Sequence, residues 1–401
     1  MKRLLLWVLL IATLAVLDSC RQPVKTSTPK PRSEPVQPKA VLTGADQIDM
    51  LLPKLSGQRV AMLVNQTAVV GKRHLADTLQ SRGVNLVKIF SPEHGIRGTA
   101  DAGEVVTDGL DPVTGIPVVS LYGAKNYKAT PKHLEDVDIV LFDIQDVGAR
   151  FFTYISSLHY MMEVCAENGK KLIILDRPNP NGSYVDGPVR KPEQKSFVGM
   201  HEIPITHGMT IGEYAQMING EGWLDGKRTC TLEVVAIKNW KHSDTYSIHI
   251  RPSPNLPNDH AIGMYPSTCL FEGTALSIGR GTQNPFEVTG HPDLKGQPYQ
   301  FTPVSIVGMS KEPPLKDQLC YGLDLRNEEI PRQVTLKYLI AMYNAFTDKD
   351  KFFIPYFDKL AGNATLKEQI RAGMTEEQIK ESWKKELDEF KAKRQKYLIY
   401  P

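Results

Sequence analysis

The segment "DIVLFDIQDVGAR", residues 138–150, decides the fold, because it is an unbroken apolar run that ends in a cluster of polar side chains. A run of this kind is typical of a strand buried on both faces of a parallel sheet. Similar apolar runs lie at residues 59–64, 85–90, 117–122 and 171–176. Helical patterns separate them near residues 73–82, 131–136 and 152–168. We therefore predict an α/β domain, residues 41–200, built on a Rossmann-like parallel sheet.

The turn after the first predicted strand bears on cofactor binding. "RVAMLV", residues 59–64, is followed by "NQTAVVG" and not by G-x-G-x-x-G. That glycine-rich turn is what brings backbone N–H groups to the pyrophosphate of a dinucleotide. The predicted sheet thus lacks the dinucleotide fingerprint, and we expect no cofactor.

The second half of the chain has a different sequence pattern. After about residue 200, proline- and glycine-rich connections replace the regular alternation, and "TLEVVAI", residues 231–237, is the clearest strand pattern. We predict a smaller α+β auxiliary domain, residues 201–401, that completes the cleft. Near its end Thr375 and Gln378 form a capping-box signature. Apolar residues then recur at helical spacing and predict a packed structural helix: Ile379, Trp383, Leu387 and Phe390.

The N-terminus has the features of a secretory lipoprotein signal. "MKRLLLWVLLIATLAVLDSC", residues 1–20, has a basic start, an apolar run too short to be a spanning helix, and a cysteine. Leu17 and Ser19 fit a bacterial lipobox, although Asp18 departs from the usual small residue, so we expect lipid on Cys20. A simple cleaved signal with an incidental cysteine is the alternative. Residues 21–40 are rich in proline and polar side chains, which predicts a disordered tether and a lipid-anchored cell-envelope location.

Composition and charge restrict the class of partner. The chain has 401 residues, 41% of them hydrophobic, and a formal net charge of +3. The excess of cationic side chains lies in the signal and the tether, which leaves the body nearly neutral and without a basic stripe. This pattern argues against a nucleic-acid partner.

Chemical groups follow the predicted strands, where the ligand crevice of an open α/β sheet lies. "IFSPEHGIRG", residues 89–98, carries Glu93 and His94 after the second strand. Glycoside hydrolysis needs two carboxyl groups, one of them a proton donor. We assign Glu93 as general acid, Asp143 as the opposing carboxylate, and His94 as a group that orients the acid or contacts sugar. Further strand-end candidates for substrate binding are Arg97, Gln145, Arg150, Asp176, Arg177 and Asn179. For Asp146, a turn cap or an ion pair with Arg150 is the favoured interpretation.

The second half adds another polar set. These substrate-binding candidates are His207, Arg251, Asn255, Glu272, Arg280, Thr282 and Glu287. Glycines on both sides of Arg280 would let its guanidinium and the backbone amides approach an anion, although a turn residue paired with an acid is equally consistent. His94, His201, His207 and His260 are possible zinc ligands, but no H-E-x-x-H spacing occurs, so we expect no metal.

Several long motifs resemble the signature blocks of the bacterial exo-β-N-acetylmuramidase family, once known as a domain of unknown function. They are "SPEHGIRG", "LFDIQDVGARFFTY", "LDRPNP", "HGMTIGEYA", "SPNLP", "YPSTCLFEGTALSIGRGT" and "PFEVTGHP". The resemblance runs from about residue 42 to the end. It implies a two-domain enzyme with a Rossmann-like catalytic part that removes N-acetylmuramic acid from the non-reducing ends of peptidoglycan fragments. It also implies that the family's presumed catalytic glutamate is Glu93.

Two other functions remain open at this point. One is a metal-dependent envelope hydrolase that uses Glu93, His94 and His207. The other is a non-catalytic lipoprotein that binds envelope glycans.

Overall fold

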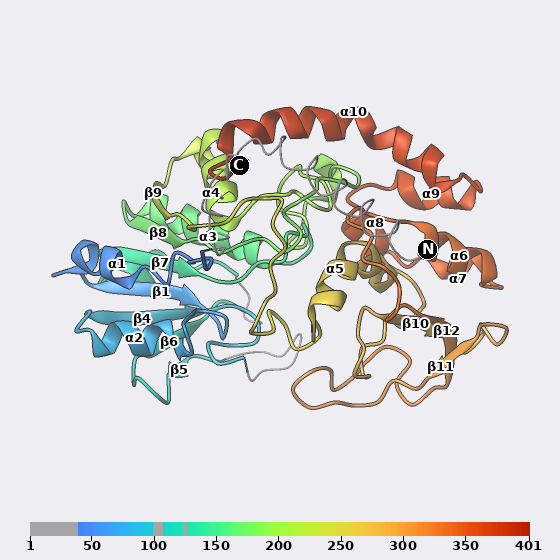
Figure 1. Cartoon of the computed structure of the whole chain (residues 1–401), viewed down its shortest axis with the longest axis horizontal. Coiled ribbons are helices and arrows are strands. Elements are labelled where there is room, and N and C mark those ends of the chain that lie inside the picture. The colour runs from blue at the N-terminus through green and yellow to red at the C-terminus, as the bar shows by residue number, and fades with distance from the viewer. Residues whose placement is uncertain (1–38, 99–106, 123–126) are drawn as a thin grey trace, which may run out of the picture. The chain divides into compact units, whose positions relative to one another are not determined.

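A computed structural model describes residues 39–98, 107–122 and 127–401 of the chain (Figure 1). The predicted signal with Cys20, and all but the last two residues of the predicted tether, lie outside the described residues. The body from Val41 to Pro401 forms one compact unit. Among the helices of the described ranges, none is both long and apolar enough to cross a membrane.

A seven-stranded sheet organises the first half of this body. Its spatial order is β5-β6-β4-β1-β7-β8-β9, and every neighbouring pair is parallel except β5 and β6. The strands are β1 (Val60–Val64), β4 (Leu86–Ser91), β5 (Gly109–Leu110), β6 (Pro117–Ser120), β7 (Ile139–Asp143), β8 (Lys171–Leu175) and β9 (Thr231–Val235). The six parallel strands follow the order 3-2-1-4-5-6 of doubly wound dinucleotide folds, so the Rossmann-like prediction is confirmed.

Helices cover both faces of this sheet, which explains its continuous apolar strands. Because successive side chains of a strand point to opposite faces, Met62 packs with one layer and Leu63 with the other. The helices of the first layer are α1 (Ile48–Leu55) and α2 (Leu75–Ser81), and those of the second are α3 (Tyr154–Glu167) and α4 (Ile211–Gly220). A short hairpin, β2 (Val69–Val70) and β3 (Arg73–His74), connects β1 to α2.

The strand predictions and two of the three helix predictions for this half are confirmed, but two other predictions are wrong. The helix predicted over 131–136 is a single 3-10 turn, Pro131–Leu134, because β7 begins soon afterwards at Ile139. The domain boundary at residue 200 is too early. β9 pairs with β8 along its whole length, and α4 covers both strands, so the sheet takes up residues well beyond that boundary.

The second half contains a three-stranded antiparallel sheet of order β10-β12-β11. Its strands are β10 (Val288–His291), β11 (Tyr299–Phe301) and β12 (Cys320–Asp324). Its helices are α5 (Asp259–Thr268), α6 (Lys337–Ala345), α7 (Lys349–Phe352), α8 (Tyr356–Ala361), α9 (Thr365–Arg371) and α10 (Glu376–Arg394). One apolar cluster includes side chains of both halves, so the two share a core.

The long C-terminal helix α10 and the segment after it behave as a structural strap. Thr375 and Gln378 form the predicted capping box, and the four predicted apolar residues of α10 are buried. The chain then returns to the first half, where the Tyr400 hydroxyl donates a hydrogen bond of 2.6 Å to Asp176 at the end of β8. Residues 201–401 are therefore not an independent domain, because both β9 and the C-terminus pack on the first sheet.

Candidate active site

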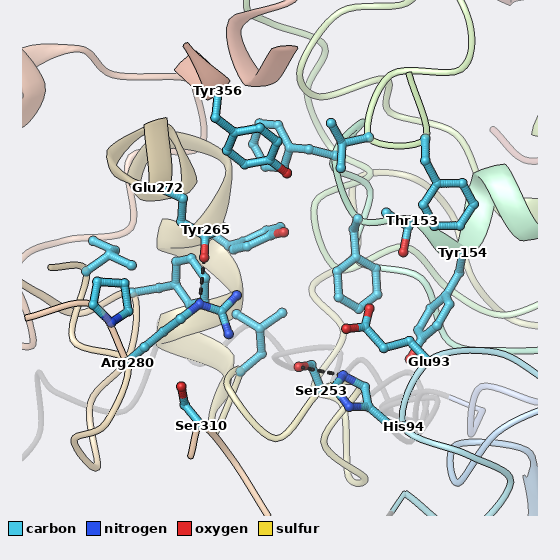
Figure 2. A pocket seen from close by; sticks show the side chains of 18 of the residues that line it. Glu93, His94, Thr153, Tyr154, Ser253, Tyr265, Glu272, Arg280, Ser310 and Tyr356 are labelled. Carbon is cyan, nitrogen blue, oxygen red and sulfur yellow. Dashed lines mark hydrogen bonds and ion pairs between the residues drawn. The ribbon is translucent and has the colours of Figure 1, made fainter. Parts of the chain in front are cut away.

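A cavity of about 630 Å³ lies where the loops after β4, β6 and β7 meet the second half of the body (Figure 2). This volume is within the usual range for small-molecule sites. Polar and charged groups project into it from both halves: Glu93, His94, Tyr122, Thr153, Tyr154, Ser253, Tyr265, Glu272, Arg280, Ser310, Glu312 and Tyr356. Its size and the polar groups that converge on it make it the first candidate for a ligand site.

Glu93 reaches the cavity through a sharp turn after β4. The strand ends at Ser91, and the backbone then adopts left-handed conformations at His94 (φ 72°) and Gly95 (φ 77°). A positive φ is costly for a residue with a Cβ atom, and such strain is concentrated at functional sites. Figure 2 shows the Glu93 and His94 side chains side by side, with the Ser253 hydroxyl 3.4 Å from Nε2 of His94.

Tyrosines surround the Glu93 carboxyl group. Burial and the neighbouring Glu93 raise the pKa of the Tyr122 hydroxyl, and the same two causes raise the pKa of Tyr154. Both phenols therefore stay protonated at neutral pH and can donate hydrogen bonds. Glu93 thus lies among hydrogen-bond donors on a largely apolar wall that includes Phe151 and Phe152.

Arg280 projects from the opposite wall of the cavity (Figure 2). It lies between Gly279 (φ 78°) and Gly281 (φ 80°), and a Cβ atom at Gly281 would lie 2.5 Å from Pro313. Its Nε donates a 2.6 Å hydrogen bond to Glu272, and its guanidinium carbon is 5.2 Å from the centre of the Phe286 ring. Burial alone would lower the pKa of Arg280, but Glu272 raises it, so the guanidinium keeps its charge.

Comparison with known proteins identifies the family. Residues 60–260 match the family model "Exo-beta-N-acetylmuramidase NamZ, N-terminal", and residues 263–400 match the corresponding C-terminal model. The chain belongs to the NamZ family. The chain is 38% identical to the peptidoglycan beta-N-acetylmuramidase NamZ of Bacillus subtilis (strain 168), over 94% of this chain and 95% of that protein.

Two solved structures show the same fold. Both are crystal structures of DUF1343 family proteins from Bacteroides fragilis NCTC 9343, and each comparison covers 90% of this chain and 99% of the other. One is 45% identical with a TM-score of 0.84, and the other is 31% identical with a TM-score of 0.76. The two NamZ models meet at the start of α5, after β9 has completed the first sheet.

Among the residues predicted from the sequence, this NamZ-family cavity brings together Glu93, His94, Glu272 and Arg280. Asp143 is not among the described residues that line it. Asp143 is fully buried, and its two oxygens accept hydrogen bonds of 2.5 and 2.9 Å from Nε and Nη2 of Arg177. The geometry contradicts the assignment of Asp143 as the opposing carboxylate, because neither side chain of this buried ion pair lines the cavity.

The ion pair considered for Asp146 and Arg150 does not form, because Arg150 donates to carbonyl oxygens of Pro188, Ile203 and Leu360. Asp146 instead caps a turn, accepting from Gly148 N at 2.6 Å, and burial raises its pKa to about 7.

His207 is buried and does not line the cavity. It is 1% exposed, its Nδ1 accepts from Met209 N, and its Nε2 is 3.8 Å from Asp146. It therefore cannot act with Glu93 and His94 in a metal-dependent site. Across the described ranges, no group of three His, Cys, Asp or Glu side chains could hold a metal ion.

The other predicted substrate-binding residues have structural partners outside the cavity. Arg97 pairs with Asp77 and Asp111; Gln145 donates to the carbonyls of Asp146 and Pro178; Asp176 accepts from Thr210, Gly212 and Tyr400; Asn179 donates to Met209 O; Asn255 donates to Met309 O; Thr282 donates to Gly279 O; and Glu287 binds Asn258 and His260. Arg251 is exposed, and its carbonyl accepts from Gln66.

Sequence reasoning missed the tyrosines of the cavity. Tyr154 and Tyr265 lie inside the motifs that carry the family resemblance, but neither was among the predicted site residues. Both are in fact mostly buried, with one face on the cavity. Their positions within long motifs rich in polar residues were the available signal.

Proposed function

We propose that this chain is an exo-β-N-acetylmuramidase that releases terminal N-acetylmuramic acid from the non-reducing ends of peptidoglycan fragments. Its membership of the NamZ family and its similarity to the Bacillus subtilis enzyme support this reaction. The structural observation that carries the proposal is that Glu93 lies on one wall of the cavity and Arg280 on the opposite wall. This arrangement fits a sugar that has both a glycosidic oxygen and a carboxylate.

Glu93 would act as the general acid. As the bond between C1 of the muramyl sugar and the glycosidic oxygen breaks, Glu93 donates its proton to that oxygen. Overall, one water molecule supplies a hydroxyl group to C1 and a proton that restores Glu93. His94 and Ser253 hold the turn from which the acid projects.

Product analysis tests this function directly. The purified full-length chain is incubated with a disaccharide that carries N-acetylmuramic acid at its non-reducing end, and the products are identified by mass. We expect free N-acetylmuramic acid and the second sugar, with unchanged rate in a strong chelator. Binding without release would favour the glycan-binding lipoprotein, and loss of activity in chelator would favour a metal-dependent hydrolase.

Arg280 would recognise the lactyl carboxylate, the group that distinguishes muramic acid from N-acetylglucosamine. Its Nε is held by Glu272, while the outer edge of its guanidinium faces the cavity (Figure 2). The other two arginines considered for this role are unsuitable, since Arg177 is buried against Asp143 and Arg251 lies outside the described cavity lining.

Arg280→Ala should therefore lower kcat/KM for a β-muramide more than for the matching β-glucosaminide. A charge-assisted contact of this kind contributes about 1.5 to 3 kcal/mol, so the muramide preference should fall by about 10- to 150-fold. Arg251→Ala, an exposed arginine outside the cavity, is the matched control and should keep the preference. Equal losses on both substrates in Arg280→Ala would remove Arg280 from this role.

We also propose that the chain is attached to an envelope membrane through lipid on Cys20. The lipobox-like start supports lipid attachment, and the proline-rich segment after it would let the body extend away from the membrane. Cys20→Ser should move the protein from the membrane fraction to the soluble fraction without changing kcat on the disaccharide. A wild-type chain that carries no lipid, with unchanged membrane association in Cys20→Ser, would contradict the anchor.

A further inference from the structure

Three aromatic rings form a stack at one side of the cavity. Tyr127 lies on Phe197 with ring centres 3.9 Å apart and an interplanar angle of 13°, and Phe197 is in turn parallel to Tyr160 of α3, at 6.3 Å and 12°. The Ser156 hydroxyl donates to the backbone carbonyl of Phe197 at 2.7 Å, which ties the middle residue to α3. Tyr127 is thus packed on a ring that is itself tied to α3.

The stack is partly open to solvent and belongs to the cavity. Tyr127 and Phe197 both line the cavity, and Tyr127 is 38% exposed. Two other large apolar side chains of the lining, Ile354 and Tyr356, are 39% and 40% exposed. Exposed apolar side chains that line one cavity are characteristic of a ligand-binding surface.

The stack can be located relative to Glu93 through Tyr122. The Tyr122 ring centre is 6.0 Å from that of Tyr127. Burial raises the pKa of the Tyr122 hydroxyl, and the neighbouring Glu93 raises it further. The stack therefore lies on the Glu93 side of the cavity, whereas Arg280 is on the opposite wall (Figure 2).

We propose that the Tyr127–Phe197–Tyr160 stack binds the leaving sugar, the pyranose that follows the terminal muramyl residue. This inference rests on the proposed muramidase function. A general acid must lie beside the glycosidic oxygen, at the junction of the two sugars. If the muramyl ring occupies the space between Arg280 and Glu93, its neighbour extends past Glu93 to the stack.

The chemistry of a pyranose suits this surface. One face of the ring consists of C–H groups that pack on an aromatic plane through dispersion and the removal of apolar surface from water. Since Tyr127 is already fixed by Phe197, little side-chain freedom is lost on binding. The stack makes no use of the lactyl or acetyl groups, so it favours a second sugar without selecting for muramic acid.

The test compares two substrates that share the muramyl sugar. One is the muramyl disaccharide and the other is methyl β-N-acetylmuramide, which has an alkoxide leaving group but no second ring. In the full-length chain, Tyr127→Ala should lower kcat/KM for the disaccharide by about three- to tenfold and leave the methyl muramide nearly unchanged. Tyr127→Phe keeps the ring and should restore the disaccharide rate.

Tyr356→Ala is the matched control, because Tyr356 is a tyrosine of the same cavity with nearly equal exposure. Burial, and then the neighbouring Cys269 and Glu272, raise the pKa of the Tyr356 hydroxyl, and Glu272 is also the partner of Arg280. Tyr356 is therefore expected to contact the muramyl ring, so both substrates should lose rate by the same factor. Equal effects of Tyr127→Ala on both substrates, or no effect on either, would overturn the leaving-sugar assignment. Failure of the wild-type chain to cleave either substrate would instead overturn the proposed muramidase function.

Discussion

Glu93→Gln is expected to reduce kcat on the muramyl disaccharide by about 10²- to 10⁴-fold, the usual contribution of a general acid. Glutamine has nearly the same shape but cannot donate the proton that the leaving oxygen needs. The turn that presents residue 93 has a left-handed backbone at His94 and Gly95, which the substitution does not change. The variant should therefore stay folded, with an unchanged circular dichroism spectrum and melting temperature.

The leaving group provides a sharper test of this role. A muramide with a strongly acidic phenol as leaving group needs little protonation, so Glu93→Gln should slow its cleavage far less than that of the disaccharide. Glu312→Gln is the matched control, because Glu312 lines the same cavity but is not placed to act as the acid. Its side chain is 80% exposed and forms an ion pair with Lys316. It should stay within about tenfold of wild type. Normal turnover of the disaccharide by folded Glu93→Gln would refute the mechanism.

Much of the fold could be predicted because burial on two faces leaves a strong pattern. Only a strand covered by helices on both sides consists almost entirely of apolar residues, as β1 and β7 do. The boundary prediction failed for the opposite reason. β9 is an edge strand of the sheet, and most of its residues are only half-buried. Its sequence therefore lacks the continuous apolar run of the other strands, and it was assigned to the second domain.

The site was harder to predict, because a polar residue near a strand end can project in several directions. Asp143 is the last residue of β7 and still lies within the sheet, so its side chain is enclosed by the layers around it. Glu93 lies two residues beyond β4, after a proline, where the chain has left the sheet. The rule that ligands bind at the carboxyl ends of strands identified the correct edge. It could not separate the residues that build the edge from those that line the cavity.

The ion pair between Asp143 and Arg177 should therefore contribute to stability and not to catalysis. Asp143→Ala would leave the Arg177 guanidinium buried without its partner, and breaking a buried ion pair in this way costs about 3–5 kcal/mol of the free energy of unfolding. Urea unfolding should measure that loss. Below the transition, the folded fraction should keep kcat and KM on the disaccharide close to wild type. If Asp143 were the opposing catalytic carboxylate, the result would be reversed, with normal stability and a loss of rate comparable to that of Glu93→Gln.

A double variant separates the charge from the volume of this pair. Asp143→Leu with Arg177→Met removes both charges and fills much of the same space with apolar atoms. Because two buried charges lose hydration that their attraction only partly restores, such replacements are often neutral or stabilising. The double variant should therefore be more stable than Asp143→Ala by several kcal/mol, about the 3–5 kcal/mol that the single change costs, and should remain active. In the wild-type chain, Nη2 of Arg177 also donates to the carbonyl of Val69 at 3.1 Å, a hydrogen bond that methionine cannot make. A double variant as unstable as Asp143→Ala would contradict this account, because removing the second charge would then have restored no stability.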